Sequence, residues 1–297
     1  MPVRPIAVVA VLLAATLTLA ACGSAAAGAG SGKLQVVAGE GMWGGIATQI
    51  GGARVHVTSF ITSPTADPHL YQSDAADAAA VAGAAVVIVN GAGYDDFTGQ
   101  VLSASGAYPR VVTVQDVLGA TGSDVNPHFW YDLRRVPLVA AAIERVLVAA
   151  DPAGAATYRA GLARFDASLR PALAVVDRIA AIYKGQPVAY TERVPGYLVT
   201  DAGLANVTPP GFATAVENGN EPSAADAQAM EDLISRHAVR LLLYNTQTSS
   251  AVTQHVLVLA RQAGVPIVDV TETQPAGESF QAWQLRQAEA ILRALGG

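Results

Sequence analysis

Cysteine is almost absent from this chain, and its single occurrence, Cys22, excludes any intramolecular disulfide. Positive charge is also scarce, because 18 Lys and Arg against 24 Asp and Glu leave a formal net charge of −6. We therefore expect no basic surface and no nucleic-acid partner. Aromatic residues make up only 6% and charged residues 14% of the chain, whereas hydrophobic residues make up 52%. This composition excludes a disordered chain and predicts a packed core.

An apolar run near the N-terminus, residues 6–21, is shorter than the roughly 20 residues of a transmembrane helix. Arg4 is the only charged residue before it, and its end is rich in small residues, which is typical of a secretory signal. The final tetrapeptide, Leu19-Ala20-Ala21-Cys22, resembles the bacterial lipobox, in which the cysteine is lipidated and becomes the mature N-terminus. An ordinary signal peptide with a coincidental cysteine is the alternative interpretation.

The segment after this run contains only Gly, Ala and Ser up to Gly32, a composition typical of a flexible tether. We expect a lipoprotein signal peptide over residues 1–21, a tether over 22–32, and lipid anchoring of Cys22. The mature chain would then lie at the extracytoplasmic face of a bacterial cell membrane as a monomer. Loss of Arg4 alone would give it a net charge of −6 − 1 = −7.

Short apolar runs alternate with helix-like segments from Lys33 to the C-terminus, and this alternation predicts α/β lobes with parallel sheets covered by helices. We expect an N-terminal lobe over residues 33–150, a linking helix over 151–184 and a C-terminal lobe over 185–297. The expected strands cover residues 34–38, 54–61, 85–90, 111–114, 187–190, 239–244 and 265–268. The other expected helices cover residues 43–50, 73–82, 132–150, 223–236, 249–262 and 280–295.

The linking helix carries apolar residues at steps of three and four positions, as one buried stripe requires. Pro171 interrupts this pattern, and proline inside a helix removes one backbone hydrogen bond and clashes with the preceding turn. We therefore expect Pro171 to kink this helix or to split it in two.

Two histidines each follow a proline in a loop after a predicted strand, namely His69 in Asp67-Pro68-His69 and His128 in Asn126-Pro127-His128. Proline restricts the loop, so it can hold an imidazole in place before a ligand arrives. Two acids follow strands of the second lobe, Glu192 and Asp269, and open α/β sheets bind ligands beyond the carboxyl ends of their strands. Two His nitrogens and two carboxylates are a plausible set of ligands for a first-row metal. Glu272 is a rival to Asp269.

From about Leu34 onward the chain resembles the metal-binding receptors of manganese and zinc ABC importers, the TroA-like proteins of cluster A-I. The resemblance is carried by several segments together, each of them unspecific by itself. These segments are residues 57–61, 67–71, 73–75, 90–94, 126–132 and 221–223.

The resemblance implies two α/β lobes joined by a long backbone helix, with a divalent transition metal ion as the transported ligand in the cleft. It assigns metal binding to His69, His128, Glu192 and Asp269, and it implies an ABC permease and its ATPase as partners. Zinc receptors of this family usually have a third His, and many have a His-rich loop, whereas this chain has five scattered histidines. The ligand set therefore favours Mn²⁺ slightly over Zn²⁺, with Fe²⁺ as a further candidate.

Two other functions remain open at this point. A receptor for a metal chelate, such as a siderophore, would need aromatic and Arg side chains in its cleft. A secreted metal-dependent hydrolase would need an open coordination position and a base. The chain has neither a His-Glu-x-x-His motif nor a nucleophile elbow, so we expect no enzymatic activity. An additional role in adhesion is also compatible with a surface lipoprotein.

Overall fold

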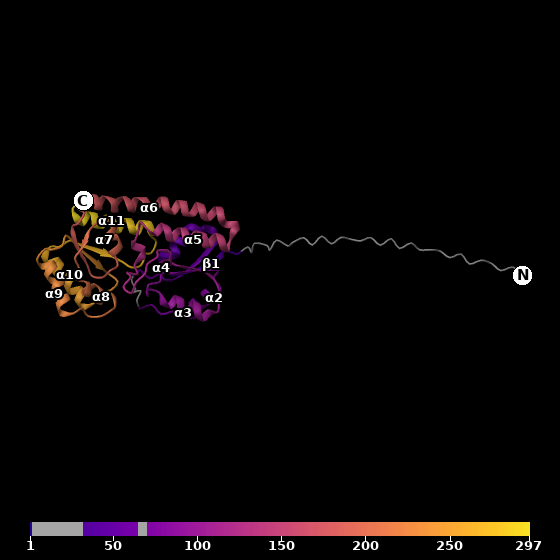
Figure 1. Ribbon diagram of the computed structural model, residues 1–297, viewed down its shortest axis with the longest axis horizontal. Helices are drawn as coiled ribbons and strands as arrows, with labels where there is room; N and C mark the ends of the chain where they lie inside the picture. Colours follow the sequence, from indigo (N-terminus) through magenta and orange to yellow (C-terminus); the bar gives the residue numbers. More distant parts are fainter. Residues whose placement is uncertain (2–31, 65–69) are drawn as a thin grey trace. The chain divides into compact units, whose positions relative to one another are not determined.

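Two four-stranded parallel sheets organise the chain in the computed structural model, which describes residues 1, 32–64 and 70–297 (Figure 1). Residues 33–297 form one compact unit that contains both sheets. The predicted signal peptide and Cys22 lie outside the described residues. The expected fold class, two α/β lobes with parallel sheets, is confirmed.

The first sheet has the strand order β2-β1-β3-β4. Its strands are β1 (Leu34–Glu40), β2 (Val55–Ile61), β3 (Val86–Val89) and β4 (Arg110–Thr113). Its helices are α1 (Gly41–Gly51), α2 (Ala75–Ala82), α3 (Asp96–Ser105), α4 (Val114–Val117) and α5 (Val136–Ala150). Val37 and Val87 pack against the α2 and α3 side, whereas Val36 and Ile88 face the main core, so both faces of the sheet are buried. Burial of both faces explains why these strands are continuous apolar runs.

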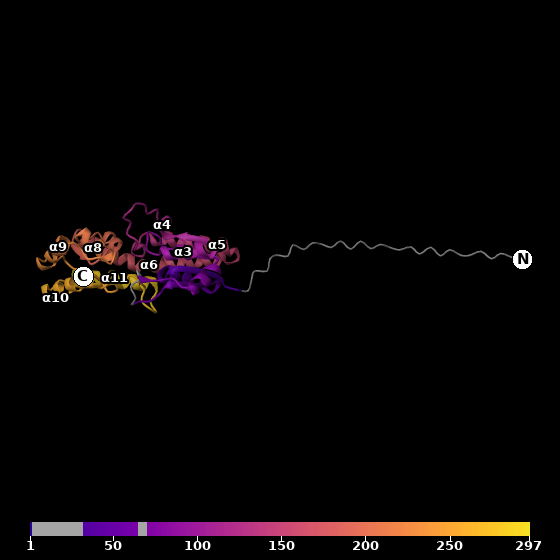
Figure 2. The same ribbon diagram turned by 90° about the horizontal axis from the view of Figure 1, so that it is seen from below.

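The second sheet has the order β6-β5-β7-β8. Its strands are β5 (Pro187–Tyr190), β6 (Ala205–Asn206), β7 (Leu242–Asn245) and β8 (Ile267–Val270). Its helices are α7 (Gly196–Asp201), α8 (Pro210–Glu217), α9 (Ala224–Ser235), α10 (Ala251–Ala263) and α11 (Phe280–Leu295). Ala189 and Leu242 pack with α8–α10, and Leu241 and Leu243 belong to the main core. Helices α8, α9 and α10 therefore lie on one side of this sheet, whereas α11 lies on the other side next to α6 (Figure 1), and Figure 2 shows the same lobe from below. Sequence periodicity did not predict α3, α4, α7, α8 or β6.

A single long helix, α6 (Ala155–Tyr183), connects the lobes and packs against α1, α5 and α11 (Figure 1). It continues through Pro171, so the predicted possibility of a split into two helices is wrong. Pro171 is exposed, while Leu169, Ala172 and Val176 beside it are buried, and this packing holds the helix together despite the lost hydrogen bond.

Close packing of α6 on α1 depends on Gly161. A Cβ atom at this position would lie 2.3 Å from the carbonyl oxygen of Ile50, a distance that side chains do not adopt. The absent side chain therefore lets the two helices approach closely.

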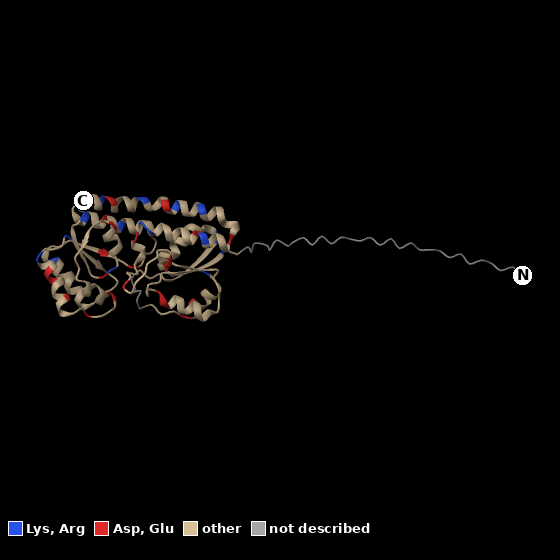
Figure 3. Cartoon of the chain, viewed as in Figure 1, with Lys and Arg blue, Asp and Glu red and all other residues tan. Residues whose placement is uncertain are grey.

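Charged residues of both signs alternate along the exposed side of α6 and are scattered over both lobes (Figure 3). None of the helices in the described part of the chain is both long and apolar enough to cross a membrane.

The order of the strands shows where a ligand should bind. In the first sheet β2 lies on one side of β1 and β3 on the other, and in the second sheet β6 and β7 flank β5 in the same way. The strand order therefore reverses between β1 and β3 and between β5 and β7. In open α/β sheets, ligands bind beyond the carboxyl ends of the strands at such points. A ligand should therefore lie nearest to the residues that follow β1, β3, β5 and β7, and the loops after the neighbouring strands end at the same edge of each sheet.

Candidate metal centre

His128 is fully buried, and a neighbouring side chain determines its tautomer. The side-chain oxygen of Asn126 lies 2.7 Å from Nδ1 of His128 and also accepts the backbone N–H of His128 at 3.1 Å. An amide oxygen can only accept hydrogen bonds, so Nδ1 of His128 must carry the proton. The lone pair of Nε2 is then available for a metal ion, and Nε2 has no hydrogen-bond partner among the described residues.

The same Asn126 side chain reaches across to the second lobe. Its Nδ2 donates to the backbone carbonyl of Arg193 at 2.8 Å, directly after Glu192 in the sequence. The hydroxyl of Tyr197 donates to the backbone carbonyl of Asn126, also at 2.8 Å. These contacts link the loop that carries His128 to the loop that carries Glu192.

Aromatic rings surround the imidazole of His128. Tyr94 and Trp130 meet it edge-on, with ring centroids 5.7 and 5.2 Å from that of His128. Tyr94 reaches this position because Gly91 and Gly93 both adopt a φ of 80°, a left-handed conformation that glycine favours. The rings exclude water from the imidazole, which strengthens electrostatic interactions there.

Two buried carboxyl groups lie beside His128. Glu192 is 1% exposed and Glu272 is fully buried, and Oε2 of Glu272 lies 3.5 Å from Nε2 of His128. The side-chain nitrogen of Asn245 donates to Oε1 of both glutamates. The hydroxyl of Tyr94 donates to Oε2 of Glu272 at 3.0 Å. Residues from both lobes therefore converge on one buried group.

The electrostatics of this group favour a bound cation. Burial raises the pKa of Glu192 well above its usual value, and the negative charges of Glu272 and then Glu217 raise it further. Burial and the charge of Glu272 also raise the pKa of Tyr94, so its hydroxyl stays protonated and donates. A positive ion between the carboxylates would offset both the burial and the repulsion.

Asp269 does not join this group. Strand β8 extends to Val270, with Asp269 paired to Tyr244, and the side chain of Asp269 lies on the exposed face. It borders a surface hollow that Arg286 and Arg293 also line. The apolar run predicted a strand that ends at residue 268, which would make Asp269 the first residue after it. Because the strand continues, the first acid beyond it is Glu272, the rival candidate, and it is Glu272 that lies beside His128.

The remaining predicted ligand, His69, lies outside the described residues. Within residues 32–64 and 70–297, no three His, Cys, Asp or Glu side chains already surround one point as a full ligand set. The candidate centre is instead defined by its pairwise contacts, between His128 and Glu272 and through Asn245 between the two glutamates.

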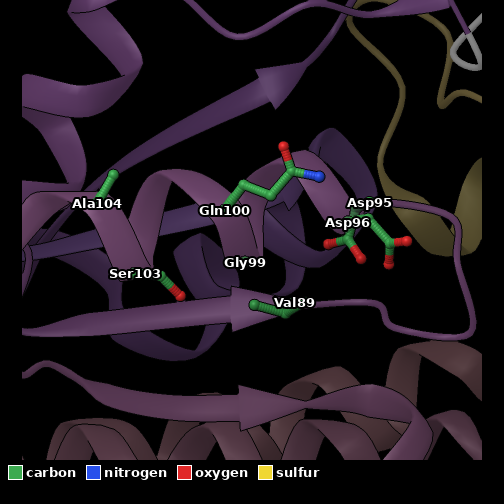
Figure 4. A pocket seen from close by; sticks show the side chains of 7 residues that line it. All are labelled: Val89, Asp95, Asp96, Gly99, Gln100, Ser103 and Ala104. Atoms are coloured by element: carbon green, nitrogen blue, oxygen red, sulfur yellow. The ribbon is translucent and has the colours of Figure 1, made fainter.

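A separate hollow of about 750 Å³ lies along α3, away from this group (Figure 4). Asp95 and Asp96 line it, but both carboxylate oxygens of Asp95 accept backbone N–H groups, from Asn90 and Gly91. Asp95 is therefore engaged in holding the loop after β3, and no residue of the candidate centre lines this hollow.

Several residues of the centre escaped sequence reasoning, namely Tyr94, Asn126 as a partner of His128, and Asn245. Tyr94 and Asn126 lie in segments that carry the family resemblance, which was a signal that they matter. Asn245 ends a strand at the ligand-binding edge, and only that position could have pointed to it.

Comparison with solved structures gives the class of fold. The periplasmic zinc-binding protein TroA of Treponema pallidum superposes with a TM-score of 0.76 at 20% identity, covering 90% of this chain and 100% of that one. The solute-binding protein FpvC of P. aeruginosa, solved with Ni²⁺, gives 0.74 at 20% identity and coverages of 89% and 97%. A Mn-bound periplasmic metal-binding protein of Candidatus Liberibacter asiaticus gives 0.73 at 19% identity, with 89% and 100% covered. The fold is that of periplasmic metal-binding proteins.

The chain belongs to the family described as the periplasmic zinc-uptake complex component A (ZnuA), whose pattern matches residues 36–294. The manganese-binding lipoprotein MntA of Bacillus subtilis (strain 168) is 30% identical over 145 residues, which are 46% of this chain and 46% of that protein. The alignment thus spans about half the length of this relative. Membership of an uptake family agrees with the expectation of a binding protein rather than an enzyme.

Proposed function

We propose that this protein is the extracytoplasmic receptor of an ABC importer and carries a divalent transition metal ion, Mn²⁺ or Zn²⁺ with Fe²⁺ as a further candidate. The observation that carries the proposal is the buried meeting of His128 with Glu272 between the two lobes, 3.5 Å apart. Neutral imidazole and carboxylates are ligands of such ions, and buried acids without a cation are costly.

The proposed ligands are His69, His128, Glu192 and Glu272. Burial, the fixed tautomer of His128 and the contacts through Asn245 support three of them. His69 rests on the resemblance of Asp67-Pro68-His69 to the motif of the family. Glu272 replaces Asp269 because the Asp269 side chain lies on the exposed face of β8.

The range of metals follows the relatives. The names of similar proteins record zinc for TroA, manganese for MntA and nickel for FpvC. One fold therefore serves several divalent ions. The donors of this chain, nitrogen and carboxylate oxygen, suit the same group of ions.

Delivery requires the receptor to stay near its importer. Residues 1–21 would direct export, Cys22 would carry the lipid, and the tether over residues 22–32 would hold the two-lobed body at the membrane surface. The bound ion would then pass to the permease, and its ATPase would drive import. The lipoprotein MntA, which is similar over about half its length, supports this arrangement.

The test is a stoichiometric metal assay on the purified chain after removal of bound metal. We expect about one tightly held equivalent of Mn²⁺ or Zn²⁺ by elemental analysis, with Glu272→Gln weakening binding strongly and Asp269→Asn acting as the matched control. If Glu272→Gln binds metal as tightly as the wild type and Asp269→Asn loses binding, Asp269 is the ligand, as the sequence predicted. No stoichiometric metal under any condition would overturn the proposal and make a chelate receptor the leading alternative.

A further inference from the structure

Asn245 lies between the two carboxylates of the candidate centre, at the end of β7. Its backbone N–H donates to the hydroxyl of Thr191 at 3.0 Å, and its side-chain oxygen accepts the backbone N–H of Gln247, also at 3.0 Å. These two contacts fix the orientation of the amide. Its Nδ2 therefore points at the glutamates, and donates to Oε1 of Glu192 and Oε1 of Glu272.

Thr248 adds a second donor to one of these oxygens. Its hydroxyl lies 3.1 Å from Oε1 of Glu272, which already accepts Asn245 at 2.7 Å. A carboxylate oxygen has two lone pairs, so this oxygen has none left for an ion. The Oε2 of Glu272 accepts the hydroxyl of Tyr94 at 3.0 Å and lies 3.5 Å from Nε2 of His128.

Glu192 shows the same division between its two oxygens. Its Oε1 accepts Asn245, whereas its Oε2 is buried and has no hydrogen-bond partner among the described residues. Each glutamate thus has its Oε1 held by Asn245, and the Oε2 of Glu272 faces Nε2 of His128. Turning either carboxylate to offer both oxygens would replace a charge-assisted hydrogen bond of the buried Asn245 amide by its weaker contact with the hydroxyl of Thr248 at 3.1 Å, which is unfavourable.

We propose that Asn245, supported by Thr248, is a specificity-determining residue that restricts both glutamates to binding the ion through a single oxygen each. The carboxylates then supply two donors instead of four. Few donors suit Zn²⁺, which is stable with four ligands, whereas Mn²⁺ prefers about six donors, mostly oxygen. This inference rests on the proposed metal-binding function and favours Zn²⁺, in contrast to the preference for Mn²⁺ expected from the ligand types alone.

The test compares the wild type with Asn245→Ala, Thr248→Val and the double variant, and uses Asn220→Ala, an exposed asparagine, as the matched control. X-ray absorption on Zn²⁺- and Mn²⁺-loaded protein counts the oxygen donors, and competition with a chelator gives the ratio of the two affinities. Zn²⁺ outcompetes Mn²⁺ at most sites with N and O donors, so a preference of the wild type for Zn²⁺ does not test the inference. The decisive quantity is the change in the Zn²⁺/Mn²⁺ affinity ratio between the wild type and the variants.

We expect one oxygen per glutamate in the wild type and in Asn220→Ala. In the double variant we expect more oxygen donors around Mn²⁺ and a fall in the Zn²⁺/Mn²⁺ affinity ratio of about tenfold. Thr248→Val is nearly isosteric and should show part of this effect even if Asn245→Ala folds poorly. Two-oxygen binding by either glutamate in the wild type, or an unchanged ratio in all three variants, would overturn the inference. If the inference fails but the wild type still binds about one equivalent of metal, the proposed receptor function stands. If the wild type binds no metal, the receptor function itself is refuted.

Discussion

Replacement of Asn126 should weaken metal binding although this side chain is not a proposed ligand. The side-chain oxygen of Asn126 is the acceptor that holds the proton of His128 on Nδ1, at 2.7 Å. In Asn126→Ala the imidazole can place its proton on either nitrogen and can rotate. The same change removes the 2.8 Å hydrogen bond to the carbonyl of Arg193 that links the two lobes.

The magnitude follows from the partners that are lost. Removing a side chain that orients a ligating histidine typically lowers metal affinity by about 10–100-fold. This corresponds to about 1.4–2.7 kcal/mol of binding free energy. Asn126→Asp separates the two roles, because a carboxylate still accepts a hydrogen bond from the N–H of Nδ1 but cannot donate to the carbonyl of Arg193. We expect its affinity to lie between those of the wild type and Asn126→Ala.

The assay is competition with a metal-binding dye at neutral pH, combined with ¹⁵N NMR of the His128 ring, which reports the tautomer directly. Asn220→Ala again serves as the exposed control. An Asn126→Ala protein that binds within twofold of the wild type, or that keeps the proton on Nδ1, would show that Asn126 does not control the imidazole.

Three further predictions concern stability and pH. Burial, and then the charge of Asp132, raise the pKa of Asp201 to about 6. Between about pH 4 and 6 the native state therefore binds more protons than the unfolded state, and the protein loses stability as the pH rises through this window. Asp201→Asn should therefore raise the free energy of unfolding in urea by about 1 kcal/mol at pH 7, after allowance for solvent screening, and by nothing at pH 3.5; an equal gain at both pH values would contradict this reasoning. Gly161→Ala should lower the free energy of unfolding by about 2 kcal/mol, because the new methyl group meets the carbonyl of Ile50 at 2.3 Å, and an unchanged urea midpoint would show that α6 can shift. Bound metal at 100 times its dissociation constant should stabilise the fold by about 2.7 kcal/mol in thermal unfolding, and acid should abolish this gain because the ligands must be deprotonated; a metal-induced shift that persists at pH 4 would argue against histidine and carboxylate ligands.

Periodicity and strand position determined much of the architecture from sequence. The β5 and α11 segments have the bounds that the sequence predicted, residues 187–190 and 280–295. Apolar runs flanked by turn residues define buried parallel strands because both faces of such a sheet are covered. Short helices such as α7 and α8 were missed, since a helix of one or two turns leaves little periodic signal.

The sequence by itself placed His128 and Glu192 at the ligand-binding edge, because each follows a strand or a rigid Pro-containing loop. Only the tertiary structure showed that Glu272, and not Asp269, lies beside His128. Side chains alternate between the faces of a strand, so the two extra residues of β8 kept Asp269 within the strand, on its exposed face, and left Glu272 as the first acid in the following loop. Asn126 and Arg193 are separated by 67 residues in the chain, and Asn245 lies 53 residues from Glu192 and 27 from Glu272. Such contacts exist only when the lobes have folded, because no local pattern encodes the approach of two distant loops.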